Sequence, residues 1–139
     1  MRVFLAVLFL PTLVFASDFK DLAEIRPFLD GVMSSVVKDD VRGAFDKLKP
    51  YWAGLPDAEI EVLVAKIIDQ RRLVAPRFGK SLEAQFVSQK TAADSVVHFL
   101  YVEKFEKHVL SWHFYLYRPK DKWQLNSMNF DDRIQALVE

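Results

Sequence analysis

The second half of the chain alternates apolar and polar side chains in four runs, and this alternation constrains the fold more than any other feature. A period of two is typical of β-strands that bury one face and expose the other. Short polar connections separate the runs, so successive strands can pair antiparallel as a meander. The predicted strands are residues 82–89, 96–105, 109–118 and 123–130.

The lengths of the connections predict the strand registers and the two faces of the sheet. Turns at 91–94, at Glu106-Lys107 and at 119–122 place Phe86 opposite Phe99, Tyr101 opposite Trp112 and Leu116 opposite Leu125. All three registers agree on one apolar face, which we expect to be the core. It holds Leu82, Ala84, Phe86, Val97, Phe99, Tyr101, Leu110, Trp112, Phe114, Leu116, Trp123 and Leu125. The opposite, mixed face includes Gln89, His98, Leu100, Val102, His113, Tyr115, Tyr117, Met128 and Phe130.

The second turn is the weakest part of this prediction. Glu106-Lys107 lacks the Gly or Asn that two-residue hairpins favour. A three-residue turn there would exchange the faces of half the sheet. The good aromatic matching favours the two-residue turn.

The first half of the chain has the spacing of helices. Apolar residues recur at intervals of three and four over residues 18–36, over a shorter segment at 41–48 that ends at Pro50, and over about 56–73. Pro27 either kinks the first helix or marks the first turn of a helix that starts near Arg26. Residues 75–79 stop the last helix and lead into the strands.

Residues 1–16 have the pattern of a secretory signal peptide. Arg2 is followed by an apolar stretch from Val3 to Val14, and Val14-Phe15-Ala16 predicts cleavage before Ser17. A spanning helix needs about 20 apolar residues, although an uncleaved anchor stays the alternative. We therefore expect a periplasmic or secreted protein with no stable membrane insertion after cleavage, and a single domain over residues 17–139.

Composition narrows the class of protein further. With no cysteine, disulfides, a cysteine-linked lipid anchor and cysteine catalysis are excluded. Lys plus Arg and Asp plus Glu both number 19, and no long basic run occurs. We therefore do not expect a positively charged surface that binds the phosphate groups of a nucleic acid.

The order of these segments resembles the cystatin-like and nuclear transport factor two-like α+β superfold. The residues that carry the resemblance are Pro50-Tyr51-Trp52 after the short helix, Phe78-Gly79 before the strands, and Lys122-Trp123-Gln124-Leu125 leading to Phe130-Asp131-Asp132. The resemblance implies helices packed on a curved four-stranded antiparallel meander that forms a cone. The superfold hosts isomerases, dehydratases, adaptors and secretion subunits, so the resemblance names no activity.

Motifs for catalysis are scarce. The four glycines form neither the nucleophile elbow of a hydrolase nor a phosphate-binding loop. Gln89-Lys90-Thr91-Ala92-Ala93 lacks the Val and Gly of the cystatin inhibitory hairpin. Enzymes of the resembled superfold place an acid or base with Tyr or His inside the cone. The inward candidates are Tyr101, Glu103, and Asp69 or Arg72 from the long helix, although Glu103 near the sheet edge is expected to be solvated.

Two surfaces remain as candidate sites. The first is a pocket for a small apolar ligand, lined by Phe86, Tyr101, Glu103, Trp112 and Phe114, unless these side chains simply fill the core. The second is an interface on the mixed face, formed by His98, His113, Tyr115, Tyr117 and Met128. In the resembled superfold, sheet-to-sheet dimers use that face.

The histidines do not predict a metal site. His98 and His113 are expected to be diagonal neighbours without a nearby carboxylate, which makes a poor ligand set, and His108 near a turn is expected to be solvated. We expect no cofactor and no metal. The leading hypothesis is a non-enzymatic, exported binding domain that forms a homodimer or binds a protein partner through the mixed face. The alternative is a small-molecule carrier or isomerase/dehydratase-like enzyme.

Overall fold

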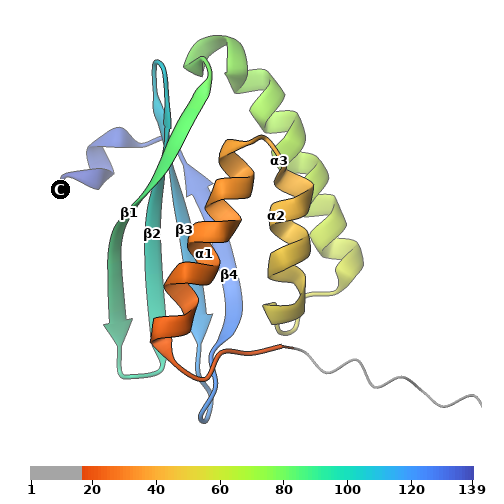
Figure 1. Ribbon diagram of the computed structural model, residues 1–139, viewed down its shortest axis with the longest axis vertical. Helices are drawn as coiled ribbons and strands as arrows, with labels where there is room; N and C mark the ends of the chain where they lie inside the picture. The colour runs from red at the N-terminus through yellow and green to blue at the C-terminus, as the bar shows by residue number, and fades with distance from the viewer. Residues whose placement is uncertain (1–16) are drawn as a thin grey trace, which may run out of the picture.

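The computed structural model describes residues 17–139, and the predicted signal peptide lies outside the described residues. The three main helices come first and the four strands follow, with two short 3-10 helices between and after them (Figure 1). The helices are α1 (Leu22–Val37), α2 (Val41–Leu48), η1 (Lys49–Tyr51), α3 (Asp57–Phe78) and η2 (Ile134–Leu137). The strands are β1 (Ser81–Ala92), β2 (Val96–Phe105), β3 (Val109–Tyr117) and β4 (Gln124–Asp131).

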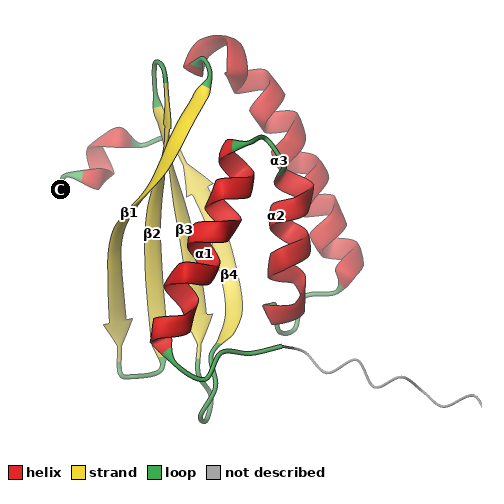
Figure 2. Cartoon of the chain, in the orientation of Figure 1, coloured by secondary structure: helices red, strands yellow, loops and turns green. Residues whose placement is uncertain are grey.

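The strands form one curved antiparallel sheet in the order β1-β2-β3-β4. Helices α1, α2 and α3 all lie on one side of this sheet, whereas η2 lies on the other side (Figures 1 and 2). We call the side that carries the three helices the inner face and the other side the outer face. The predicted α+β fold, with helices on an open four-stranded meander, is confirmed.

The core lies between the inner face and the helices. Predicted inner residues such as Phe99, Trp112 and Phe114 are at most 1% exposed, and they pack against Ile25, Leu29, Phe45 and other helix residues in one cluster. Three predicted core residues behave differently. Ala84 and Phe86 are half-buried, and Leu82 is 55% exposed.

The second and third hairpins have the predicted registers. Phe99 pairs with Phe114 and Tyr101 with Trp112, while Leu116 pairs with Leu125. The turn at Glu106-Lys107 is therefore a two-residue turn despite its unusual residues. Its geometry is supported from outside the hairpin, because the backbone N–H of Lys107 donates to Phe78 O at 2.9 Å.

The predicted first register is wrong. β1 continues to Ala92, and the turn lies at residues 93–95, where Ala93 and Asp94 have positive φ angles. Phe86 consequently pairs with Tyr101 instead of Phe99, and β-bulges interrupt the pairing near residues 82 and 87. A bulge moves the following residues to the other face. Gln89, predicted on the mixed face, therefore pairs with Phe99 and shares its inner face.

The predicted face of Met128 and Phe130 is also wrong. A bulge in β4 shifts the pairing between Leu125 and Ser127, so that Met128 lies opposite Phe114 on the inner face. Phe130 stacks on Trp112 with ring centroids 5.1 Å apart. Both side chains pack against the core. Met128 therefore does not belong to the outer face.

The helix boundaries depart from the prediction at two prolines. α1 begins at Leu22 and runs through Pro27, which therefore does not mark its first turn. α3 also continues past Pro76 to Phe78. It ends at Gly79, whose φ of 79° and ψ of −159° lie in a region that is essentially restricted to glycine. A Cβ on Gly79 would lie 2.9 Å from Cβ of Glu106.

Candidate functional site

The predicted pocket residues lie in or beside the core. Tyr101, Trp112 and Phe114 are buried, and the Tyr101 hydroxyl donates a hydrogen bond to Oδ1 of Asp30 in α1 at 2.7 Å. Burial raises the pKa of Tyr101, and the hydrogen bond to Asp30 raises it further. Phe86 lies beneath the guanidinium of Arg26, with 3.8 Å between Cζ and the ring centroid.

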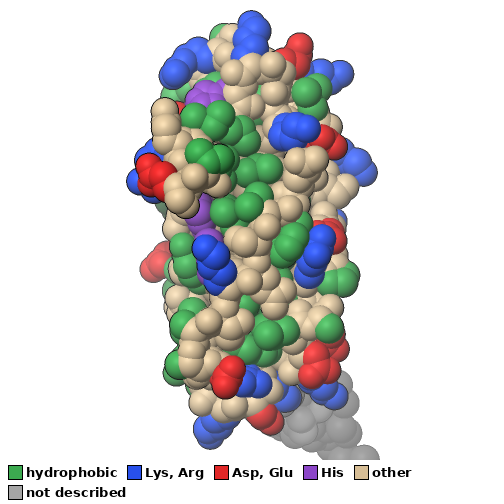
Figure 3. Space-filling model, turned by 90° about the vertical axis from the view of Figure 1, so that its left-hand side faces the viewer, with side chains coloured by type: hydrophobic (Ala, Val, Ile, Leu, Met, Phe, Trp, Pro, Cys, Tyr) green, Lys and Arg blue, Asp and Glu red, His purple; other side chains and the backbone are tan. Residues whose placement is uncertain are grey.

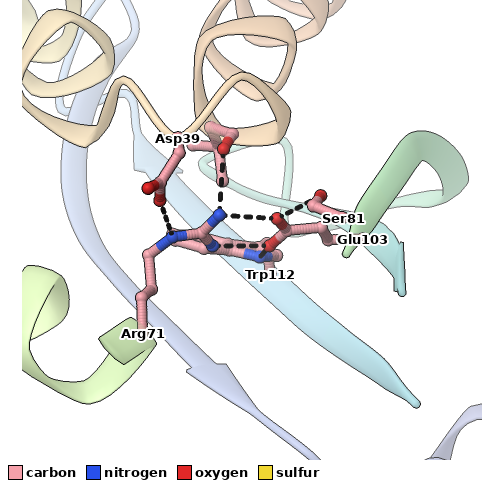
Figure 4. A network of polar contacts seen from close by, with 6 residues as sticks. Asp39, Arg71, Ser81, Glu103 and Trp112 are labelled. Carbon is pink, nitrogen blue, oxygen red and sulfur yellow. Dashed lines mark hydrogen bonds and ion pairs between the residues drawn. The ribbon is translucent and has the colours of Figure 1, made fainter. Parts of the chain in front are cut away.

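Glu103 is fully buried, so the expectation that it is solvated is wrong. Arg71 is the charged residue of α3 that reaches Glu103, whereas the predicted inward candidates Asp69 and Arg72 have side chains that are 74% and 78% exposed. Arg71 Nη1 and Nη2 donate to the two oxygens of Glu103, each at 3.0 Å (Figure 4). This bidentate arrangement is the strong form of a charge-assisted pair.

The remaining atoms of this buried pair are also engaged. Glu103 accepts further hydrogen bonds from Ser81 Oγ at 2.8 Å and from Trp112 Nε1 at 3.1 Å. Arg71 Nε donates to Asp39 Oδ1 at 2.9 Å, and its Nη2 donates to Val36 O at 3.1 Å. Burial alone would lower the pKa of Arg71, but the hydrogen bonds and charges of Glu103 and Asp39 raise it overall.

This network links α3 and the end of α1 to strands β1, β2 and β3. Four hydrogen bonds reach the Glu103 carboxylate, which is about the number that its two oxygens can accept. Glu103 therefore has no free lone pair with which to take a proton from a substrate. In its present arrangement the pair joins α3, the end of α1 and β2.

Three cavities of the structure lie outside the predicted pocket. The largest one described has a volume of about 640 Å³ and lies between the α1–α2 corner, the second half of α3 and the start of β1. Two smaller ones, of about 410 and 280 Å³, follow the seam between α1 and β1. None of the five predicted pocket residues lines these three cavities.

Four side chains on the outer face form a connected group, which we call the outer-face cluster: His98, His113, Tyr115 and Asp131. His98 Nε2 lies 2.9 Å from His113 Nδ1, and His113 Nε2 lies 3.2 Å from Asp131 Oδ2. The ring of Tyr115 stacks on His98 with centroids 4.6 Å apart. The expected diagonal contact of the histidines is present, but the expectation that no carboxylate lies nearby is wrong.

The hydrogen bonds of the outer-face cluster define one neutral arrangement. When His113 Nε2–H donates to Asp131, His113 Nδ1 is the acceptor for His98 Nε2–H. A second added proton would place two N–H groups against each other and break the contact between the rings. Burial lowers the pKa of His98, and the charges of His113 and Lys90 lower it further.

The outer face has the mixed character that the sequence predicted. Figure 3, which looks at the side of the molecule that carries β1 and η2, shows histidine side chains beside hydrophobic ones. Leu100, Val102 and Tyr115 are half-buried, and Tyr117 is exposed. His108, expected to be solvated, is instead half-buried with its ring centroid 4.4 Å from that of Phe78.

Residues 17–139 offer neither a cluster of metal ligands nor a helix that could span a membrane. No group of three or more His, Asp or Glu side chains in this part is placed to hold a metal ion. Within the same residues, every helix is too short or too polar to cross a bilayer.

Comparisons with known proteins add one structural similarity. No protein-family model matches the chain, and no curated protein matches it. A crystal structure from Campylobacter jejuni, described as a candidate NTF2-like transpeptidase, is similar over 77% of this chain and 99% of that one. The identity is 14% and the TM-score is 0.49. Similarity at this level does not extend that protein's activity to this chain.

Proposed function

We propose that the protein is an exported, non-enzymatic interaction domain that binds a second copy of itself through the outer face of its sheet. The observation that carries the proposal is the one-sided placement of the helices (Figure 1). All three main helices cover the inner face, which leaves the stacked rings of His98, His113 and Tyr115 with only the short η2 nearby on their side. Aromatic side chains such as tyrosine are enriched at protein interfaces.

The size of the outer face suits a dimer. At about 3.4 Å per residue and about 4.8 Å between strands, four strands of this length present roughly 500 Å² of flat area. Side chains add to this figure, and a standard interface buries about 800 Å² of accessible surface per partner. The face is therefore large enough for one partner of ordinary size.

The charges of the outer face favour a second copy over a strongly charged partner. Lys104 pairs with Glu83 at 2.6 Å, and Lys90 and Asp131 add one charge of each sign. A face with balanced charges around an apolar centre can meet itself across a two-fold axis without repulsion. A strongly acidic or basic partner would find no complementary field there.

The inner polar groups support a binding role over catalysis. The predicted acid, Glu103, and the predicted hydroxyl, Tyr101, are both engaged in hydrogen bonds within the fold. Either group would have to break a buried contact before it could act on a substrate. This supports the interaction hypothesis over the isomerase-like alternative.

Export rests on residues 1–16 alone. We expect protein recovered from the cell envelope or medium to begin at Ser17, because Val14-Phe15-Ala16 has the residues of a cleavage site. Intact mass spectrometry measures this directly. A mass that includes residues 1–16 would contradict cleavage and support the anchor instead.

The dimer should depend on pH through the outer-face cluster. The groups that face the two histidines are Lys90 from β1, Tyr115 from β3 and Asp131 from β4, and Arg133 lies 3.7 Å from Asp131. Burial lowers the pKa of His98 from its ordinary value of 6.5, and burial of the same ring against a second copy would lower it further. The dimer is therefore most stable above about pH 6.5, and this stability is lost as the pH falls through the lowered pKa of His98.

Sedimentation velocity of the chain from Ser17 tests both steps. We expect a dimer at about pH 7.5 and a shift toward monomer at about pH 5, where a protonated His98 resists the desolvation that the interface requires. His98→Gln should reduce the shift, whereas His108→Gln, a change in the connection between β2 and β3, should preserve it. A monomer at every pH would reject the dimer, and a dimer with no pH response would reject only the histidine mechanism.

A further inference from the structure

We propose that the largest cavity, which we call the corner cleft, binds a small organic anion: a carboxylate carried on an apolar body. The corner cleft has a volume of about 640 Å³, within the range of about 300–1,000 Å³ of small-molecule sites. Its walls come from the end of α1, the start of α2, the second half of α3 and the start of β1. It lies on the helix side, so this ligand is independent of the proposed dimer.

More basic than acidic side chains line the corner cleft, in a protein whose formal net charge is zero. Five basic side chains and two acidic ones line it, whereas Glu61, Glu103 and Asp69, which pair with three of the basic ones, lie outside the lining. The basic residues are Lys38, Arg42, Arg71, Arg72 and Lys80, and the acidic ones are Asp39 and Asp40. The basic side chains that have no carboxylate partner are therefore the ones that can attract an anion.

The acidic residues at the corner cleft are already engaged. Asp39 accepts from Arg71 Nε at 2.9 Å, and Asp40 caps α2 by accepting from Gly43 N at 2.9 Å. Nearby Glu106 accepts from the backbone N–H of Lys80 at 2.7 Å. These carboxylates keep their negative charge, and their contacts hold the local backbone and Arg71 in place.

Lys38 and Lys80 are the charges most available to a ligand. Arg42 is paired with Glu61 at 2.7 Å, and Arg72 lies 3.9 Å from Asp69. Arg71 is paired with Glu103 and Asp39. Within residues 17–139, no carboxylate oxygen lies within 4.0 Å of the ammonium group of Lys38 or Lys80. Two flexible ammonium groups on different walls can close on one anion.

The rest of the lining favours an organic anion over a bare inorganic one. Five apolar residues contribute to the corner cleft: Val37, Val41, Ile68, Ala75 and Phe105. An inorganic anion would leave these surfaces in contact with water. A carboxylate on an apolar body would bury them while its charge meets the lysines.

Calorimetric titration with octanoate at low salt tests this proposal. We expect saturable binding of one octanoate per chain. Lys38→Gln/Lys80→Gln should weaken it at least about tenfold, since charge-assisted contacts are lost. Lys20→Gln/Lys120→Gln is the matched control, because it removes the same charge at the opposite end of the molecule and should preserve the affinity.

Three results would overturn the proposal. Titration without saturation would show that the corner cleft does not bind a small carboxylate. Equal weakening in the two double variants would show that octanoate responds to overall charge only. Competition by inorganic phosphate at the concentration of octanoate would contradict the role of the apolar lining. Circular dichroism of each variant shows whether it folds. If the Lys38→Gln/Lys80→Gln variant does not fold, the single variant Lys38→Gln takes its place in the titration.

Discussion

Replacing Arg71 with methionine is expected to lower the free energy of unfolding by about 3–5 kcal/mol, because it leaves the Glu103 carboxylate buried without its counter-charge. Glu103 is 0% exposed, and the Arg71 side chain is 10% exposed, so water can replace little of the lost contact. Urea unfolding followed by tryptophan fluorescence, at one fixed protein concentration, measures the change. Trp112 donates directly to Glu103 and is a local reporter of the pair.

The neighbouring arginine is the matched control for this prediction. Arg72→Met removes the same charge from a side chain that is 78% exposed, and it should change stability by no more than about 0.5 kcal/mol. The double change Arg71→Met/Glu103→Met should recover most of the loss, since a buried ion pair can be replaced by apolar side chains at little cost. If Arg71→Met were as mild as Arg72→Met, the buried pair would not hold α3 to the sheet.

The faces of β2 and β3 could be predicted from sequence because one two-residue turn fixes their register. Tyr101 pairs with Trp112 as expected, since a two-residue turn leaves few alternative pairings. The same reasoning failed wherever a bulge adds a residue to one strand. The bulges near residues 82 and 87, and the one in β4, have no sequence pattern that alternation alone can detect.

These bulges decide which residues reach the candidate sites. The bulge in β4 carries Met128 inward, and it brings Asp131 opposite Ser111 and within reach of His113. Sequence reasoning missed Asp131 for this reason. The acidic pair Asp131-Asp132 that follows Phe130 was the only signal, and its position relative to the histidines depended on the bulge.

The buried ion pair left a clearer signal. Arg71 follows Ile60, Val64 and Ile67 at spacings of four, three and four, so it continues the buried stripe of α3. A charged residue on a buried stripe predicts a buried partner of opposite charge, because an unpaired charge there is too costly. Glu103 lies between the inward Tyr101 and Phe105 in the alternation, which identifies it as that partner.

A single charge on the outer face should separate the proposed dimer. Tyr115→Glu replaces a ring that stacks on His98 with a carboxylate at the centre of the face. In a two-fold dimer each interface receives this charge from both copies, and the like charges repel in a desolvated centre. We expect at least about a hundredfold weaker association, with the circular dichroism spectrum unchanged because Tyr115 is only half-buried in the monomer.

Val62→Glu is the matched control for that variant. Val62 is an apolar side chain that is 70% exposed on α3, on the helix side of the sheet. It receives the same new charge without touching the outer face. Loss of the dimer in both variants would indicate a general effect of charge, and loss only in Val62→Glu would place the interface on α3.

The molar mass of three proteins, measured by light scattering at one concentration and neutral pH, tests the central claim most directly. The proteins are the chain from Ser17, its Tyr115→Glu variant and its Val62→Glu variant. We predict the mass of a dimer for the first and third and half that mass for the second. A monomeric unmutated chain, or a Tyr115→Glu variant that keeps the mass of the dimer, would contradict docking through the outer face.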